Sequence, residues 1–261
     1  MTDRADRRLI AITHFPSPQM EQGERTYVGD EPIDGALALR QHEAYRDALR
    51  RCGAAIVLLD ANFRFPDGVF VEDTSVVLDE VAVMMSMGAP SRRGETPAIE
   101  AELARWRRIE RVELPATIDG GDVVRAGHSL YVGRSPRTND AGIAALRSIA
   151  APFGYSVTAV AVTGCLHLKT ACSALPGGRF LVNADWIDAA PFPRDALVAV
   201  PASEPWAGDV LVIGRRVVLS DAFPRTAALL SDLGAEPIPV AVSEFAKAEG
   251  GVTCLSLVFA A

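Results

Sequence analysis

The feature that most constrains this chain is a motif that occurs five times along it. Gly121-Asp122-Val123 and Gly208-Asp209-Val210 each begin a segment that reads as strand, glycine turn, strand, and then Pro-Arg-Thr leading into an amphipathic helix. Weaker copies begin at Glu72, His167 and Gly251, so successive copies start roughly 45 residues apart, a spacing typical of repeat arrays. The sheet of each unit needs a neighbour to cover it. We therefore predict an α/β fold in which five strand–helix units share one core.

Hydrophobic periodicity and turn residues predict the individual elements. Strands are predicted at Leu9–Thr13, Ile56–Leu59, Val81–Met85, Arg179–Asn183 and Val252–Phe259, and helices at Leu37–Cys52, Thr96–Arg107, Asp140–Ala150 and Thr226–Leu233. His42 falls on the first of these helices, where we expect a surface or hydrogen-bonded side chain and no catalytic role. His14 and His128 have no accompanying motif, and we expect both to be structural.

Length and charge exclude several classes of protein. The chain has 261 residues, of which 49% are hydrophobic, and a formal net charge of −7. The negative charge argues against binding to nucleic acid or to anionic membranes, and no apolar run approaches the length of a transmembrane helix. The charged segment at residues 1–8 lacks the apolar core of a signal peptide. We expect a single catalytic domain over residues 1–261, located in the cytoplasm.

The four cysteines, Cys52, Cys165, Cys172 and Cys254, are scattered without a C-x-x-C pair, which favours free thiols over disulfides. Cys254 has no second cysteine or histidine at ligand spacing, so no metal site is expected there. Cys254 follows two glycines at the beginning of the predicted last strand, where a thiol is well placed to act as a nucleophile. The alternative is a buried structural cysteine, since cysteine is among the most buried residue types.

The repeats favour the nucleophile. Units arranged around an axis bring equivalent positions to the centre, and those positions carry Glu72 and Asp73, Asp119, His167 and Cys254. A thiol needs a nearby base or cation to become reactive, and a histidine needs a partner that orients it. An acid, an imidazole and a thiol from different repeats supply that combination.

Six motifs in this order resemble those of the dimethylarginine dimethylaminohydrolases, and together they cover nearly the whole chain. They are F-P-D-G-V-F-V-E-D-T, S-R-R-G-E, I-D-G-G-D, P-R-T-N, C-L-H-L-K-T and G-G-V-T-C-L-S-L. The resemblance implies the pentein fold, a five-fold pseudosymmetric α/β propeller. It also implies hydrolysis of Nω-methylated arginine to citrulline and an alkylamine through a covalent thiouronium intermediate, with no metal or organic cofactor.

Residue by residue, the resemblance makes Cys254 the nucleophile, His167 the acid and base, and Asp119 the acid that holds the histidine. It places Asp67, Asp73 and the neighbouring Glu72 around the guanidinium, and Arg92 and Arg137 on the substrate α-carboxylate. Carboxylates suit a buried guanidinium, and the arginine fork suits a carboxylate. For these charged residues the alternative is a solvated surface ion pair.

Two positions depart from the family pattern: Asp119 stands where a glutamate is usual, and Glu24 stands where a leucine usually lies in the lid over the substrate. Within enzymes, the alternative reading is an arginine deiminase-like or other substituted-arginine hydrolase. In another class, some penteins are non-catalytic ribosome-binding factors, which lack the thiol, histidine and acid. The expected partner is a small arginine derivative, and a homodimer stays open.

Overall fold

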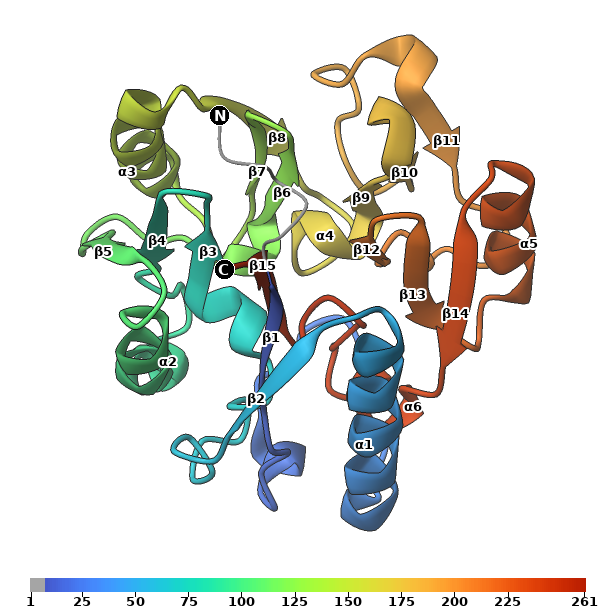
Figure 1. Ribbon diagram of the computed structural model, residues 1–261, viewed down its shortest axis with the longest axis horizontal. Coiled ribbons are helices and arrows are strands. Elements are labelled where there is room, and N and C mark those ends of the chain that lie inside the picture. Colours follow the sequence, from blue (N-terminus) through green and yellow to red (C-terminus); the bar gives the residue numbers. More distant parts are fainter. Residues whose placement is uncertain (1–7) are drawn as a thin grey trace.

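The computed structural model describes residues 8–261, and its strands form five three-stranded sheets around a common centre (Figure 1). The sheets are β3–β4–β5 (Ser75–Val77, Val81–Met84, Arg108–Arg111), β6–β7–β8 (Val123–Ala126, Ser129–Arg134, Ser156–Ala161), β9–β10–β11 (Cys172–Ala174, Phe180–Val182, Leu197–Ala199), β12–β13–β14 (Leu211–Ile213, Arg216–Ser220, Glu236–Val240) and β15–β1–β2 (Leu257–Ala260, Leu9–His14, Ala55–Leu59). The predicted five-fold α/β propeller is confirmed.

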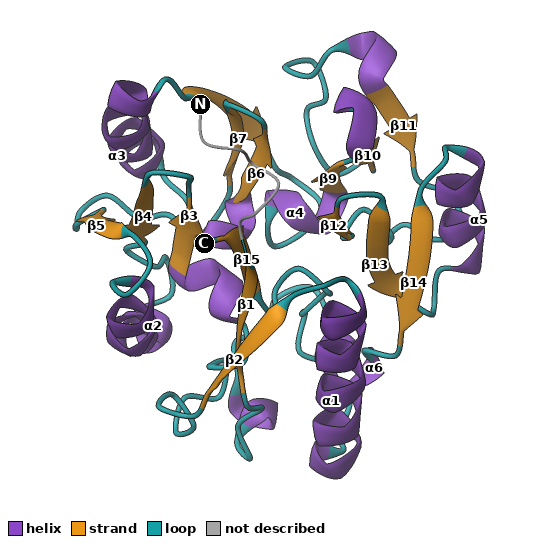
Figure 2. Cartoon of the chain, in the orientation of Figure 1, coloured by secondary structure: helices purple, strands orange, loops and turns teal. Residues whose placement is uncertain are grey.

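The three strands pair in the same way in every sheet. Its middle strand pairs antiparallel with the inner strand and parallel with the outer strand. Parallel neighbours need a crossover, which is usually a helix. Four sheets have one in that position: α1 (Gly35–Arg51), α2 (Thr96–Leu103), α3 (Asp140–Ala150) and α5 (Pro224–Asp232). These helices lie outside the strands (Figure 2).

The fourth unit departs from the predicted repeat. Between β10 and β11 the chain runs through residues 183–196, in which the only helical turn is the 3-10 segment Arg194–Ala196. Two prolines, Pro191 and Pro193, and an Asp-Ala-Ala run explain the difference, because this segment lacks the apolar period of an amphipathic helix. The aromatic rings of Tyr131, Phe180 and Phe192 stack there and cover the sheet instead.

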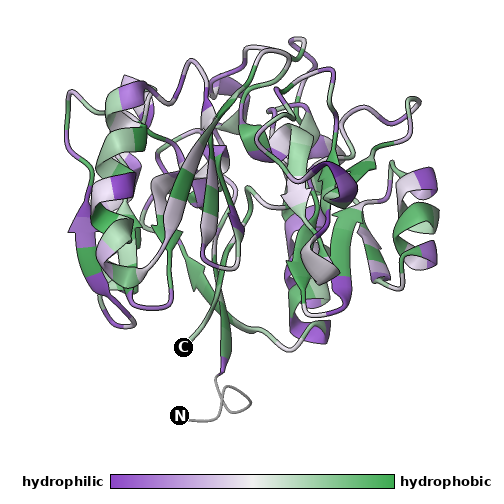
Figure 3. Ribbon diagram, turned by 90° about the horizontal axis from the view of Figure 1, so that it is seen from above, coloured by the Kyte–Doolittle hydropathy of each residue, from purple (hydrophilic) through white to green (hydrophobic). Residues whose placement is uncertain are grey.

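The core lies between the sheets and their helices. Figure 3 shows hydrophobic residues concentrated along the strands and hydrophilic residues on the peripheral helices and loops. The helix α3 illustrates the pattern, since Ile143, Leu146 and Ala150 are buried against β7 and β8 while its other face is open. The spacing i, i+3, i+7 places these three on one side of the helix.

The ring is closed by strands from opposite ends of the chain. β1 pairs with β15 through Leu9 opposite Ala260 and Ile12 opposite Leu257, and it pairs on its other edge with β2. Tyr45, on α1 and fully buried, donates from its hydroxyl to the carbonyl of Val252 at 2.8 Å and contacts the hydroxyl of Ser256 at 2.7 Å. The first long helix thereby fixes the turn that precedes the last strand.

Three sequence predictions were wrong in detail. The last strand begins at Leu257, and Cys254 lies in the preceding turn, residues 252–255, instead of on a strand. The helix predicted to reach Arg107 ends at Leu103. His42 is neither exposed nor hydrogen-bonded: it is fully buried, both ring nitrogens lack a partner among the described residues, and burial lowers its pKa to about 3.

The other two histidines are structural, as expected. His14 accepts a hydrogen bond at Nε2 from the backbone of Asn62, and His128 stacks on the ring of Tyr155. The charged N-terminal segment, for which no signal peptide was predicted, lies outside the described residues except for Arg8. Among residues 8–261, no helix combines the length and the apolar character that a membrane crossing requires.

We predict that Tyr45→Phe keeps the fold but lowers the free energy of unfolding by about 1–3 kcal/mol, because the carbonyl of Val252 loses its buried donor. Denaturant titration measures the change. The matched control is Tyr131→Phe, whose ring stacks on Phe192 and whose hydroxyl makes no hydrogen bond to a described residue. Equal stability of the two variants would contradict the prediction.

Candidate active site

The site lies at the centre of the ring, on the short segments that precede the inner strands. These are the 3-10 turns Val71–Thr74 and Gly120–Asp122, the helix α4 (Leu168–Ala171) with the residue before it, and the turn at residues 252–255. They bring together one small cavity lined by Glu24, Asp67, Phe70, Asp73, Arg92, Arg137, Leu166, His167, Ala248, Glu249, Gly250 and Cys254. Six of the eight residues predicted from the sequence therefore share one cavity.

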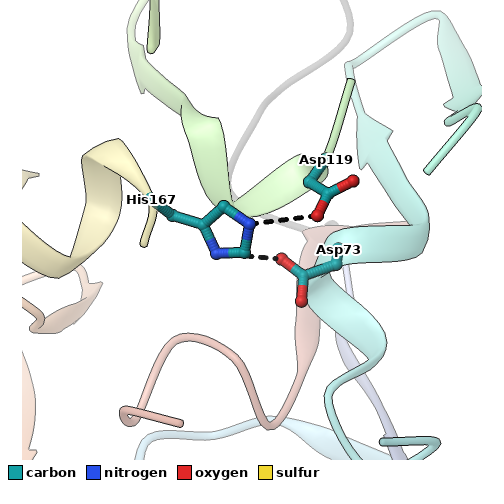
Figure 4. A group of neighbouring side chains, drawn as sticks. All are labelled: Asp73, Asp119 and His167. Carbon is teal, nitrogen blue, oxygen red and sulfur yellow. Dashed lines mark hydrogen bonds and ion pairs between the residues drawn. The ribbon is translucent and has the colours of Figure 1, made fainter. Parts of the chain in front are cut away.

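His167 is held between two carboxylates (Figure 4). Its Nε2 lies 3.0 Å from Oδ2 of Asp119, and its Nδ1 lies 3.7 Å from Oδ1 of Asp73. Asp119 lies behind the ring, outside the cavity, and its other oxygen accepts from the backbone of Gly88 at 2.8 Å. Burial lowers the pKa of His167, but Asp73, Asp119 and Asp122 outweigh it and raise the pKa to about 9. The imidazole is therefore protonated at neutral pH.

Gly121 is required for this arrangement. Its backbone nitrogen donates to Oδ1 of Asp73 at 3.1 Å. A Cβ atom at Gly121 would lie 2.6 Å from Oδ1 of Asp73 and 2.7 Å from Nδ1 of His167. Both side chains approach the backbone only because no side chain is present there.

Arg92 organises the carboxylate side of the cavity. Its guanidinium donates to Oδ2 of Asp73 at 2.6 Å, to both oxygens of Glu95, and to the backbone carbonyls of Asp67 and Phe70. Burial raises the pKa of Asp73, but the charges of His167 and Arg92 outweigh it, and the pKa is lowered. Burial also raises the pKa of Asp67, with Arg92 opposing the shift. Arg92 is thus fully engaged within the protein.

Arg137 differs from Arg92. It is buried and lines the cavity, yet its Nη1 has no hydrogen-bond partner among the described residues and lies 3.9 Å from Oδ2 of Asp119. A buried guanidinium with free donors is costly unless a ligand pairs with it. Arg137 is therefore the arginine available to an anionic group.

The thiol of Cys254 lies between the backbone of Gly251 and the carboxylate of Asp209. Its Sγ lies 3.4 Å from the nitrogen of Gly251 and 4.0 Å from Oδ2 of Asp209. Burial, and then the charges of Asp209, Glu72 and Asp73, raise the pKa of this thiol well above its ordinary value. The raised pKa keeps the sulfur a neutral thiol at neutral pH.

Glu72 does not face the cavity. Its carboxylate accepts from Nζ of Lys169 at 2.6 Å and from the hydroxyl of Thr253 at 2.7 Å. All three residues line a separate cavity along the inner strands, on the other side of the catalytic turns. Burial raises the pKa of Glu72, while Lys169 opposes the shift.

Three residues at the site carry contacts that sequence reasoning did not assign to them. Asp209 touches the thiol, although its motif matches that of Gly121-Asp122-Val123 and could have indicated it. Glu249 has a left-handed backbone (φ 60°) and its carboxylate accepts from the backbone nitrogens of Tyr27 and Val28, which no local pattern predicts. Glu24 places its backbone nitrogen 3.1 Å from Oδ2 of Asp67, while its side chain accepts from Ser91.

Asp73, Asp119 and His167 have ligand atoms within 4.8 Å of one another, a spacing that a metal ion could span. In this protein the positive charges come from other side chains. Arg92 pairs with Asp73, and Arg137 lies near Asp119. The protonated imidazole supplies the third cation. The negative charges of Asp73 and Asp119 are therefore balanced by neighbouring protein side chains.

The chain resembles known proteins over most of its length. Residues 25–175 match the family described as N,N dimethylarginine dimethylhydrolase, eukaryotic. A dimethylarginine dimethylaminohydrolase of Streptomyces coelicolor is 43% identical over 95% of each chain, and one of Pseudomonas aeruginosa is 37% identical over 87% of this chain and 90% of that one. The chain belongs to the dimethylarginine dimethylaminohydrolase family.

Solved structures of the family agree with this fold. A histidine-to-glycine variant in adduct with S-methyl-L-thiocitrulline is 35% identical, with 95% of this chain and 98% of that chain covered and a TM-score of 0.90. A cysteine-to-serine variant of the Pseudomonas aeruginosa enzyme bound to citrulline is 34% identical over the same shares, with a TM-score of 0.88. The N-terminal domain of the cyanobacterial arginine dihydrolase ArgZ has a TM-score of 0.81 at 19% identity over 96% of this chain and 97% of that chain, a likeness in fold alone.

The two departures from the dimethylarginine dimethylaminohydrolase pattern are both accommodated. Asp119 reaches His167 at hydrogen-bond distance despite its shorter side chain. Glu24 lies at the mouth of the cavity, where Gly23 allows close approach to Asp67: a Cβ atom at Gly23 would lie 2.3 Å from Oδ1 of Asp67. The lid is therefore attached to one of the carboxylates that faces the cavity.

We predict that an NMR titration of the His167 ring gives a pKa of about 9 in the unliganded protein, with the signal assigned by its loss in His167→Gln. Asp119→Asn removes a carboxylate beside Nε2 and should lower this pKa, because the charged form loses a partner. A titration midpoint that stays unchanged in Asp119→Asn would show that Asp119 does not stabilise the imidazolium.

Proposed function

We propose that the protein hydrolyses Nω-methylated arginine to citrulline and an alkylamine through a covalent intermediate on Cys254. The observation that carries the proposal is that the lining of one cavity includes a thiol, a protonated imidazole, the carboxylates of Asp67 and Asp73, and the buried Arg137 with free donors. Membership in the dimethylarginine dimethylaminohydrolase family supports it, as do the family structures with citrulline and thiocitrulline ligands. We further propose that residues 1–261 act as a single catalytic domain in the cytoplasm, where the four free thiols stay reduced.

The charges of the cavity match both ends of this substrate. A guanidinium is cationic and planar, so the carboxylates of Asp67 and Asp73 suit it when water is excluded. Arg137 has the unpaired donors that a substrate α-carboxylate requires. Arg92 contributes by holding Asp73 in place. The carboxylate of Glu24 lies at the mouth, where it suits the α-ammonium group.

Binding of the substrate prepares the nucleophile. The guanidinium cation lies beside the sulfur and lowers the cost of forming a thiolate there. The thiolate of Cys254 attacks the guanidinium carbon and forms a tetrahedral adduct. His167, protonated in the resting protein, gives its proton to the alkylamine nitrogen, and the carbon–nitrogen bond breaks to leave an S-alkylthiouronium.

His167 is neutral after the amine departs, so it can then act as a base. It takes a proton from water as the oxygen attacks the same carbon. Collapse of the second adduct breaks the carbon–sulfur bond and the remaining O–H bond, whose proton passes to solvent, so that the ureido group of citrulline is released and the sulfur leaves as a thiolate. Asp119 fixes the ring through both steps and stabilises its protonated form.

The cavity is closed in this structure. Its volume of about 20 Å³ is close to the space that one water molecule needs. An arginine-sized ligand therefore enters only when the lid at Gly23–Tyr27 moves. The contacts from Glu24 to Asp67 and from Glu249 to the lid backbone are those that opening must break.

An arginine deiminase-like activity is the second candidate within the same chemistry, because the cavity itself does not select the leaving amine. The test is to incubate the protein with arginine, monomethylarginine, asymmetric dimethylarginine and Nω-hydroxyarginine, and to measure ureido product and released amine. Preference for the methylated substrates supports the proposal. Preference for arginine, with release of ammonia, would instead support the deiminase.

Cys254→Ser should abolish turnover while the fold is retained, because a serine hydroxyl is far harder to ionise than a thiol. Mass spectrometry after treatment with a haloacetamidine should place the label on Cys254 in the wild type. Turnover in Cys254→Ser, or a label on Cys165 or Cys172, would refute covalent catalysis at this residue.

Arg137→Lys should reduce kcat/KM for a methylated arginine by about 10–100-fold, the effect of losing a charged hydrogen bond of about 1.5–3 kcal/mol. Agmatine, which lacks the carboxylate, should be a poor substrate for both proteins and should discriminate little between them. Arg92→Lys serves as the contrast, because it leaves buried carboxylates unpaired and should lower stability as well. Equal losses on both substrates in Arg137→Lys would assign Arg137 another role.

Asp119→Asn should reduce kcat by at least about 10²-fold, because His167 loses the partner that orients it and stabilises its charge. Asp119→Glu should also reduce kcat, since the backbone already brings the shorter side chain to 3.0 Å from Nε2. Steady-state kinetics on all three proteins test this pair. An unchanged kcat and pH profile in Asp119→Asn would remove Asp119 from the catalytic set.

A further inference from the structure

We propose that Asp209 is the base that takes the proton from the thiol of Cys254 and returns it at the end of the cycle. The proposal rests on the covalent function proposed above and adds a residue to it. The transfer breaks the S–H bond and forms an O–H bond on Asp209, while the electron pair stays on sulfur. One negative charge moves from the carboxylate to the sulfur, where it meets the substrate cation.

The carboxylate of Asp209 is placed for this transfer. It is buried, and its Oδ2 lies 4.0 Å from the sulfur of Cys254. Its Oδ1 accepts from the backbone nitrogen of Thr253 at 3.0 Å, and its Oδ2 lies 3.2 Å from the hydroxyl of Thr253, whose one proton is shared with the closer Glu72 at 2.7 Å. A Cβ atom at Gly251 would lie 2.2 Å from Oδ2, so the glycine before the catalytic turn gives the carboxylate its space.

Comparison with the equivalent aspartate of another repeat shows that Asp209 has fewer hydrogen bonds. Asp122, at the same position of the same motif, accepts at Oδ1 from the backbone of Leu168 at 2.9 Å, as Asp209 does from Thr253. Its Oδ2 is occupied by the hydroxyls of Ser135 and Thr138, each at 2.6 Å. Asp209 has a single, longer hydroxyl contact at Oδ2 and faces a thiol there. The same aspartate position therefore serves the fold as Asp122 in one repeat and lies beside a thiol as Asp209 in another.

His167 cannot take this proton in the resting protein. It is already protonated, with one ring nitrogen on Asp119 and the other toward Asp73. The other carboxylates near the site are engaged: Glu72 with Lys169, Asp73 with Arg92, and Asp67 with the backbone of Glu24, as their contacts given above show. Among the described residues, Asp209 is the carboxylate with an oxygen in contact with the sulfur.

The charge environment suits a proton acceptor. Burial, and then the charge of Glu72, raise the pKa of Asp209 to about 7, while Thr253 and Lys169 oppose the shift. A base with a pKa near the working pH is ionised often enough to accept and acidic enough to return the proton. The other titratable groups that face this carboxylate are Cys254 itself and Tyr45, whose pKa is raised well above its ordinary value, mainly by burial.

Asp209 also borders a second cavity, which gives its proton a route to water. This cavity has a volume of about 600 Å³ and lies behind the turn of Glu249–Gly251, lined by Tyr27, Val28, Trp206, Asp209, Phe223 and Val252 among others. Exposed Asp221 and Trp206 mark its opening at the surface. The active-site cavity and this one share Glu249 and Gly250 as their dividing wall.

The experiment compares Asp209→Asn with wild type by pH–rate profile and by alkylation of Cys254 with iodoacetamide, a neutral reagent. We expect kcat/KM to fall by at least about 10²-fold and the acidic limb near pH 7 to disappear. Alkylation in the absence of substrate should become faster at a given pH, because a negative neighbour that disfavours the thiolate is gone. A residue that only surrounds the sulfur would not move the two rates in opposite directions.

Asp221→Asn is the matched control: it removes a carboxylate from the same cavity without a contact to the sulfur, and both rates should stay at wild-type values. Unchanged kcat/KM and an unchanged acidic limb in Asp209→Asn would overturn the proposal. Faster turnover together with faster alkylation would do the same, because Asp209 would then act only as a charge.

A second variant covers the case in which Asp209→Asn does not fold. Thr253→Val keeps the carboxylate but removes the hydroxyl that Asp209 shares with Glu72, so both acids lose a donor, the pKa of Asp209 should rise and the acidic limb should move to higher pH. An unmoved limb would contradict the proposal. Turnover by Cys254→Ser would refute the underlying function, whereas an inactive Cys254→Ser with a fully active Asp209→Asn would refute only the role of Asp209.

Discussion

The buried ion pair between Arg92 and Asp73 holds the centre of this protein together. At 2.6 Å, with both side chains almost fully buried, it would be costly to break because a single charge would be left in the interior. Asp73 in turn binds the backbone of Gly121 and faces His167, which contacts Asp119. The position of the His167 imidazole thus depends on a series of charged contacts that includes Arg92, Asp73 and Asp119.

The same balance explains how the protein tolerates so many acids at its centre. Each buried carboxylate faces a cation or an array of donors, and the distribution is uneven. Asp122 is fully hydrogen-bonded and serves the fold, whereas Arg137 keeps free donors and Asp209 keeps a free side. The groups to which we assign a role in binding or catalysis are those whose pairing is incomplete, which is also where a ligand gains most by binding.

Much of the fold follows from the sequence because the repeat is a global constraint. Five similar units imply a ring, and strand and helix order within a unit follow from local periodicity. The absence of an α-helix from residues 183–196 was not predicted, because the other repeats have a helix at the equivalent place. The turn at Cys254 was misassigned because β-branched and aliphatic residues extend from Val252 to Phe259, whereas contacts of residues 252–255 with Tyr45, Asp209 and Glu72 come from distant parts of the chain.

The six predicted residues that share the cavity all stand in sequence motifs, whereas the contacts that the sequence did not indicate depend on packing. Cys254 and His167 stand in distinctive runs, and the family pattern extends to Asp67, Asp73 and Arg137. The orientation of Glu72 toward Lys169 and away from the cavity is a matter of packing between repeats, which no local sequence expresses. His42 shows the same limit, since its burial without a partner depends on Phe245 from the other end of the chain.

The closing pair of β1 with β15 has a consequence for the order in which activity is acquired. Ribosomal synthesis makes Asp67, Asp73, both arginines and His167 before it makes Cys254, the proposed nucleophile, which directly precedes the strand that closes the ring. The same final segment of the chain supplies both Cys254 and the strand β15 that pairs with β1. The proposed chemistry therefore requires the last residues of the chain, and a protein truncated before them would lack both the thiol and the closed ring.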